Sequence, residues 1–162
     1  MTHVWLLVGL GLCVVGQAIL LEPLGVAGIR PDLFLLLVCF LSQRLTPEAA
    51  TLQGFLIGLT QDALSGGPLG LRAFTNSLLA FAASCLSRDL HTEAPLAQFG
   101  LLFAGSLGVG LLSLVLYLFF FGVVSPLPAL LRVIVPEAAY TAAAGVLIFS
   151  LPRIRAALVR LA

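Results

Sequence analysis

The chain has 162 residues, of which 60% are hydrophobic and only 9% are charged. A soluble domain is about 45–50% apolar and roughly 25% charged, so a chain with so few charges could not cover a water-exposed surface. The composition excludes an ordinary soluble domain and predicts an integral membrane protein, all α-helical because an open sheet edge cannot exist in lipid. A net charge of +1 without any lysine also leaves no basic patch for nucleic acid.

The first apolar segment, residues 4–21, is interrupted only by Gln17 and is close to the shortest length that spans a bilayer. A cleaved signal peptide is the competing interpretation. It would need a basic region before Val4 and a small-residue cleavage site before Glu22, and the sequence has neither. We therefore expect a retained transmembrane helix.

Prolines, glycines and polar residues divide the rest of the chain into helices. Pro31 suits a first helical turn, and Thr46 followed by Pro47 and Glu48 resembles a helix cap. Apolar spacing at 127–134 predicts a short amphipathic helix at the membrane interface. The sequence thus predicts one membrane domain, 1–162, with about six helices at 4–21, 31–45, 48–64, 69–86, 97–124 and 136–151. Whether the second of them crosses the membrane fully stays open, which leaves five or six crossings.

The arginines predict the orientation in the membrane. With six crossings, five of them fall on the side of the termini, namely Arg44, Arg88, Arg153, Arg155 and Arg160. The other three fall on the opposite side, namely Arg30, Arg72 and Arg132. Cytoplasmic loops carry an excess of basic residues, so both termini are expected in the cytoplasm.

Small residues recur at helical spacing on three predicted helices, and such stripes let helix backbones approach closely. The stripes are Gly54 and Gly58, then Gly100, Ala104 and Gly108, and finally Ala138, Thr141, Ala142 and Gly145. They could serve packing inside the protein, or one of them could dock a partner's transmembrane helix. The spacing does not separate these two interpretations.

Asp62 lies four residues after Gly58 and shares its helix face, so it points into a helix contact rather than at lipid. It could accept backbone N–H groups from the turn at 65–67, or pair with Arg72 across that turn. Proton or ion handling is a third interpretation, because charged groups at membrane depth are costly and often functional.

Catalytic and metal chemistry find no support in the sequence. The cysteines lie in apolar helices without C-x-x-C spacing, at Cys13, Cys39 and Cys85. An intramembrane aspartyl protease would need Asp62 to pair with Asp32 or Asp89, and no serine-nucleophile motif occurs. We expect a protein that is not an enzyme and that carries no cofactor or metal.

The motif Gly54-Phe55-x-x-Gly58-x-x-x-Asp62 is preceded by Arg30-Pro31-Asp32-Leu33 and followed by Ser65-Gly66-x-Pro68-Leu69-Gly70. Over residues 30–86 this pattern resembles the MreD family, the small polytopic rod-shape-determining proteins of bacteria. Elsewhere the similarity is in length, helix number and a basic C-terminus. The candidate structural or partner-binding residues are Pro31, Gly54, Gly58, Asp62, Gly66, Pro68, Gly70 and Arg72.

The resemblance implies a non-catalytic part of the cell-elongation machinery in the bacterial inner (cytoplasmic) membrane. Such a protein would bind the bitopic membrane protein MreC, in a complex with RodA, a class B penicillin-binding protein and MreB, and would help organise peptidoglycan synthases. Faces rich in glycine and alanine would receive the transmembrane helix of MreC. Asp62 and the turn at 66–70 would stabilise the fold near the periplasmic side.

The second interpretation is a substrate-binding S component of an energy-coupling-factor vitamin transporter, to which the predicted bundle is similar in size and helix number. An S component would need a polar ligand pocket near the outer side of the membrane. The candidates for such a pocket are Arg72, Asn76, Glu137 and Tyr140.

Overall fold

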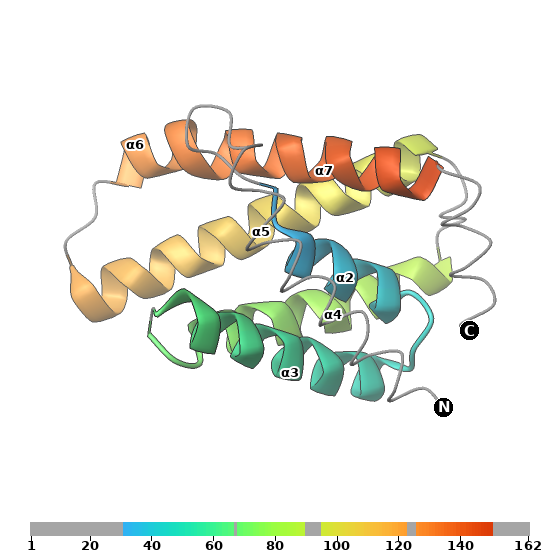
Figure 1. Cartoon of the computed structure of the whole chain (residues 1–162), viewed down its shortest axis with the longest axis horizontal. Coiled ribbons are helices and arrows are strands. Elements are labelled where there is room, and N and C mark those ends of the chain that lie inside the picture. The colour runs from blue at the N-terminus through green and yellow to red at the C-terminus, as the bar shows by residue number, and fades with distance from the viewer. Residues whose placement is uncertain (1–30, 67, 90–94, 123–125, 151–162) are drawn as a thin grey trace.

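The structure is a computed structural model that describes residues 31–66, 68–89, 95–122 and 126–150. Within these ranges the chain is helical and contains no strand (Figure 1). The helices are α2 (Leu33–Ser42), α3 (Pro47–Ser65), α4 (Leu71–Asp89), α5 (Pro95–Phe121), α6 (Pro126–Ala129), the π-helical turn η2 (Leu130–Ile134) and α7 (Val135–Ser150). The helix predicted at 4–21 and the arginines of the C-terminal tail lie outside the described residues.

α2 is shorter than the helix predicted at 31–45. Asp32 is its N-cap, and the carboxylate Oδ1 accepts the backbone N–H groups of Phe34 at 3.0 Å and Leu35 at 3.1 Å. Pro31 therefore precedes the cap instead of occupying the first helical turn. The ten residues of α2 rise about 15 Å, which is half of the ~30 Å hydrocarbon core, so α2 is too short to cross it.

α3 begins as the sequence predicts. The Thr46 hydroxyl accepts the N–H of Ala49 at 3.4 Å, with Pro47 and Glu48 in the first turn. The helix ends at Gly66, whose φ of +64° is a left-handed conformation that a residue with a Cβ adopts only at a cost. The N-terminal cap predicted at Thr46, Pro47 and Glu48 is thus confirmed.

The last two predicted elements form one continuous helical segment. The α-helix predicted at 136–151 corresponds to α7, but α6, η2 and α7 follow one another without a break from Pro126 to Ser150, so Pro136 does not separate it from the short helix predicted at 127–134. In a regular α-helix the proline ring collides with the carbonyl four residues earlier. In η2 the N–H of Val135 binds the carbonyl of Leu130, five residues back. We attribute the passage of the helix through Pro136 to this wider turn.

The short helix α2 forms the centre of the bundle. α3 packs against α4, α5 packs against α7, and α2 contacts all four of them. Figure 1 shows α2 between α7 on one side and the α3–α4 pair on the other. Val38 and Cys39 of α2 have no exposed surface. The N-terminus of α2 is therefore held where side chains of several helices can reach it.

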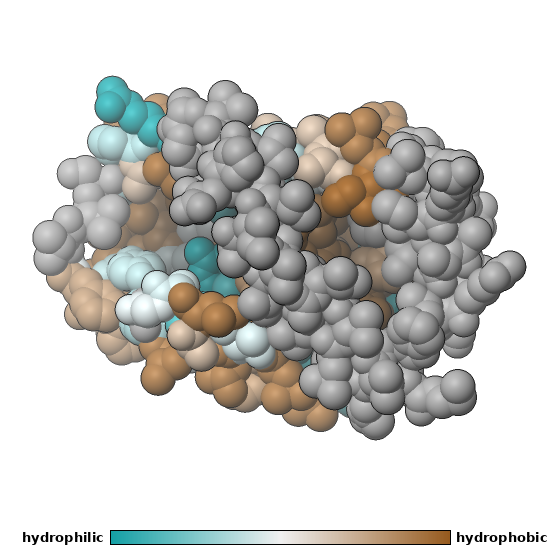
Figure 2. Space-filling view, in the orientation of Figure 1, coloured by the Kyte–Doolittle hydropathy of each residue, from teal (hydrophilic) through white to brown (hydrophobic). Residues whose placement is uncertain are grey.

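Polarity in this bundle is reversed relative to a soluble protein. Phe119 is 82% exposed, whereas Asp62 and Asn76 are each 2% exposed. Figure 2 shows hydrophobic residues along the lower edge and at the upper right of this face, a hydrophilic patch recessed near its centre, and a hydrophilic group at the upper left corner. By length and composition, the helices at Leu96–Phe121 and Pro126–Ile148 could cross a membrane. This distribution is the one expected where lipid, and not water, surrounds the helices.

Candidate functional site

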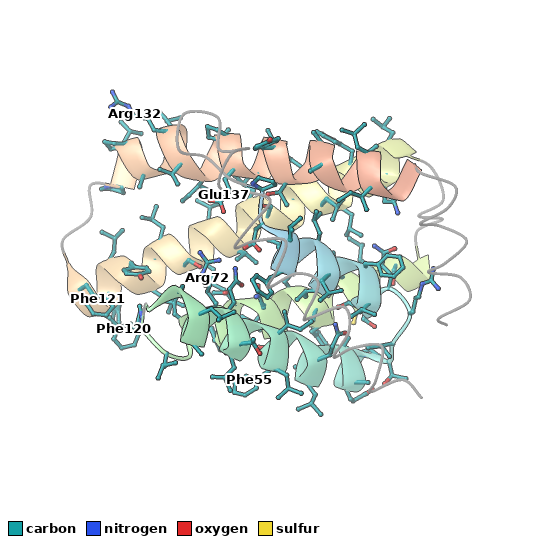
Figure 3. All side chains as sticks on the ribbon, in the orientation of Figure 1. Phe55, Arg72, Phe120, Phe121, Arg132 and Glu137 are labelled. Atoms are coloured by element: carbon teal, nitrogen blue, oxygen red, sulfur yellow. The ribbon has the colours of Figure 1, made fainter. Side chains whose placement is uncertain are left out.

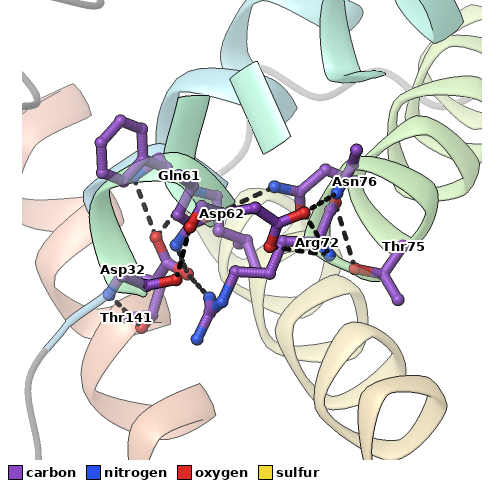
Figure 4. Close-up of polar contacts among 11 residues, drawn as sticks. Asp32, Gln61, Asp62, Arg72, Thr75, Asn76 and Thr141 are labelled. Carbon is purple, nitrogen blue, oxygen red and sulfur yellow. Dashed lines mark hydrogen bonds and ion pairs between the residues drawn. The ribbon is translucent and has the colours of Figure 1, made fainter. Parts of the chain in front are cut away.

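Polar side chains from four helices meet inside the bundle (Figure 4). We call this set the polar core, and it consists of Asp32, Gln61, Asp62, Arg72, Asn76 and Thr141. All are buried except Arg72, whose side chain is 38% exposed. They come from the start of α2, the end of α3, the start of α4 and the middle of α7, so the polar core joins segments far apart in the sequence.

The Asp62 carboxylate caps the N-terminus of α4. Its oxygens accept the backbone N–H groups of Gly70 at 2.8 Å, Arg72 at 3.1 Å and Ala73 at 3.2 Å. The first N–H groups of a helix have no partner within it, and a negative charge is favourable at this end. Asp62 therefore accepts backbone N–H groups from the start of α4, and none of the hydrogen bonds among the described residues joins its carboxylate to residues 65–66 of the turn.

Asp32 joins α2 to three other helices. Its Oδ2 accepts a hydrogen bond from Gln61 Nε2 at 2.9 Å and forms an ion pair with Arg72 at 3.1 Å. Its backbone N–H donates to Thr141 Oγ1 at 3.1 Å. The guanidinium of Arg72 thus pairs with Asp32, whereas only its backbone N–H binds Asp62. The positive charge of Arg72 and the negative charge of Asp32 compensate each other inside the bundle.

Sequence reasoning missed Gln61 and assigned Asp32 no structural role. The Gln61 side chain donates to Asp32 and accepts from Asn76 Nδ2 at 3.2 Å, so one amide connects α2 with α4. Two features of the sequence could have indicated these roles. Gln61 lies seven residues after Gly54 and therefore on the same helix face. Asp32 stands directly before an apolar helix, where N-caps occur.

Gly54 and Gly58 allow α3 and α4 to approach closely. A Cβ added at Gly54 would lie 2.5 Å from the carbonyl oxygen of Asn76, and one at Gly58 would lie 2.6 Å from Ala73 Cα. Atoms do not approach so closely, so neither position has room for a side chain. The first small-residue stripe is therefore filled by the chain's own α4.

The other candidate residues shape the α3–α4 turn and the start of α2. Gly66 and Gly70 adopt φ angles of +64° and +98° on the two sides of the turn. Pro68 is half-buried and lines a small cavity of about 180 Å³ together with Asp62. Pro31 is buried beside the α2 cap.

The small-residue stripe of α5 is open. A Cβ added at Gly100 or Gly108 would meet no heavy atom of the described residues within 4 Å, and Ala104 between them is exposed. These residues line an apolar groove of about 560 Å³, here called the α4/α5 groove, whose other wall runs from Thr75 to Leu86 of α4. Unlike the stripe on α3, the stripe on α5 presents a surface that no described residue covers.

The α7 stripe, by contrast, is occupied from within. A Cβ added at Gly145 would lie 2.7 Å from Leu36 Cδ2, and Ala138 and Ala142 have no exposed surface. Among the described residues, the stripe on α5 is the one of the three that no other helix fills.

The carboxylates of the polar core are engaged in holding the helices together. Asp62 accepts N–H groups of α4, and Asp32 accepts N–H groups of α2 and pairs with Arg72. Within the described part of the chain, no group of three or more His, Cys, Asp or Glu side chains could hold a metal ion. The buried polar core and the apolar exterior define a helical membrane protein with an open helix-packing groove.

Comparison with protein families identifies the class to which this protein belongs. The model of the MreD family, described as rod shape-determining protein MreD, matches residues 1–151. The chain belongs to this family of rod shape-determining membrane proteins. The match extends well beyond residues 30–86, where the motif is recognisable by eye. No curated protein and no solved structure matches the chain.

Proposed function

We propose that this protein is a non-catalytic component of the rod-shape machinery in the bacterial inner membrane. In this role it binds the transmembrane helix of MreC and helps organise RodA, a class B penicillin-binding protein and MreB. The observation that carries the proposal is the open α4/α5 groove in a chain of the MreD family. The structural candidates at Gly54, Gly58 and Asp62 support it indirectly, because they hold the α4 wall of that groove in place.

The dimensions of the α4/α5 groove suit a docked helix. Its α5 wall runs from Ala97 to Leu112, a rise of about 22 Å, or roughly four helical turns. Helix association in lipid is driven largely by close packing at small residues. Gly100, Ala104 and Gly108 leave this wall open to a partner's backbone.

We further propose a multi-pass topology with both termini in the cytoplasm. Arg44 lies at the α2–α3 connection, whereas Arg132 lies at the opposite end of the bundle and Arg72 lies further inside it, at the start of α4 (Figures 1 and 3). Exposed phenylalanines at 119–121 stand at the same end as Arg132 and present apolar surface that suits contact with lipid. This end is assigned to the periplasm.

The test is an affinity pulldown in mild detergent, with mass spectrometry of proteins and small molecules. Gly108→Leu fills the groove at a position where a side chain meets no described neighbour. Ala63→Leu is the matched control, because it adds bulk on an exposed part of α3. Wild type and Ala63→Leu are expected to recover MreC and the cell-wall synthases. Gly108→Leu is expected to lose MreC while eluting as a folded protein in size-exclusion chromatography.

Equal recovery of MreC by all three proteins would exclude the groove as its binding site. Recovery of a vitamin and an ATPase module in place of MreC would overturn the proposal in favour of a transporter S component. A photo-crosslinker at Leu112, in the α5 wall, identifies the occupant directly. A cross-link to MreC supports the proposal, whereas one confined to the chain's own residues 4–21 contradicts it.

A further inference from the structure

A further cavity, on the other side of α5, has the carboxylate of Glu137 in its wall, and this carboxylate does not belong to the polar core. The cavity has a volume of about 310 Å³, and its wall includes Asp32, Arg72 and Glu137. Figure 3 shows Arg72 and Glu137 on facing sides of the space between α4 and α7. The cavity therefore brings three ionisable side chains together within the bundle.

Two of the three charges are already matched. Arg72 and Asp32 form an ion pair at 3.1 Å. Glu137, in the first turn of α7, receives no hydrogen bond and no ion pair from the described residues. A carboxylate within a membrane-spanning helix is costly unless a cation or a hydrogen-bond donor accompanies it. Arg72, in the wall of the same cavity, acts on Glu137 electrostatically, but its ion pair is with Asp32, so no cation of the described residues is bound to the Glu137 carboxylate.

The remaining wall is suited to a small ligand with an apolar part. Its wall includes Ser113 and Tyr117, which carry hydroxyl groups, and the apolar residues Val109 and Ile134. Ile134 belongs to η2, and π-helical turns are frequent at functional sites. A volume of about 310 Å³ is at the lower end of the range for small-molecule pockets, about 300–1,000 Å³.

We propose that this cavity binds a primary ammonium group, carried by a small soluble amine or by a lipid headgroup. The ammonium lies at the Glu137 carboxylate, the hydroxyls of Ser113 and Tyr117 accept its other hydrogens, and a short apolar part packs on Val109 and Ile134. This binding site goes beyond the scaffold role and does not depend on MreC.

The soluble arm of the test uses the full chain purified in dodecyl maltoside. Thermal unfolding is followed during titration with n-butylammonium, with n-butanol and butyrate as neutral and anionic analogues. Only butylammonium is expected to give a saturable rise in melting temperature. Glu137→Gln is expected to weaken this binding about thirtyfold or more, because it removes one partner of a buried charge pair. Glu48→Gln is the matched control, an exposed carboxylate on α3, and should bind as the wild type does.

The lipid arm compares phosphatidylethanolamine with phosphatidylcholine, whose trimethylated amine has no N–H donor. Stabilisation by phosphatidylethanolamine alone that depends on Glu137 identifies a headgroup as the source, and stabilisation by butylammonium alone identifies a soluble amine. Absence of any stabilisation that depends on Glu137 in both arms overturns the proposal. If Glu137→Gln does not fold, Glu137→Asp keeps the charge and is expected to keep the preference for ammonium over butanol. Ammonium binding seen only in Arg30→Gln would show that the chain's own arginine fills the site, which also overturns the proposal.

Discussion

Gly58→Ala tests the close approach of α3 and α4. The added Cβ would lie 2.6 Å from Ala73 Cα and 2.7 Å from Ala73 N, well inside the optimum for carbon atoms of about 3.5–4.0 Å. Because the obstructing atoms belong to the backbone of α4, no side-chain rotation relieves the contact. The two helices must separate by roughly 1 Å to restore an ordinary contact distance.

The expected cost follows from three contributions. Overpacking a close contact costs typically about 1–3 kcal/mol. The separation also weakens the Asp62 cap of α4, which crosses the same contact, and loss of a helix cap costs about 1 kcal/mol. Replacing glycine by alanine within a helix contributes about 1 kcal/mol in the opposite direction. We expect the free energy of unfolding to fall by about 1–3 kcal/mol.

The assay is SDS titration in mixed micelles, followed by circular dichroism. Gly108→Ala is the matched control, since its Cβ meets no described atom within 4 Å, and it should be neutral or stabilising by up to about 1 kcal/mol. A Gly58→Ala protein as stable as wild type would refute the argument that backbone contact requires glycine there. So would a Gly108→Ala protein that loses as much stability as Gly58→Ala.

Three further changes probe the polar core and its turn. Asp62→Asn should be better tolerated than Asp62→Leu, because the amide oxygen can still accept N–H groups of α4. Leucine leaves these groups unsatisfied at a cost of about 2 kcal/mol or more. If the two variants give equally low yields of monodisperse protein in size-exclusion chromatography, the negative charge itself is required. Arg72→Gln leaves Asp32 without its ion-pair partner and should lower the free energy of unfolding by about 1–3 kcal/mol. This is less than the cost of breaking a fully buried pair, because Arg72 is partly exposed. An SDS unfolding curve equal to that of the wild type would contradict the expectation. In Gly70→Ala a residue with a Cβ must adopt a φ of +98°, which should lower the free energy of unfolding by about 1–2 kcal/mol. Gly100→Ala, within the regular helix α5, should show no loss of stability in the same SDS titration.

Much of the local architecture can be predicted from the sequence because it depends on neighbouring residues alone. The cap at Thr46 requires only a hydroxyl, a proline and a carboxylate in succession, and the structure contains it. The shared face of Gly54, Gly58 and Asp62 follows from helical periodicity. The sequence predicts the helix that begins near Pro136, but not its continuity with the preceding segment, because the proline is accommodated by a π-helical turn.

The sequence by itself determined that this is an α-helical membrane protein of the MreD family, and which faces carry small or charged residues. Only the tertiary structure decided how those faces are used: the α3 stripe is filled, the α5 stripe is open, and Arg72 pairs with Asp32 rather than Asp62. The hydrogen bonds of Asp32 reach residues 29 and 109 positions away. Such contacts depend on how helices pack against one another, and helical periodicity specifies a face but not the neighbour that covers it.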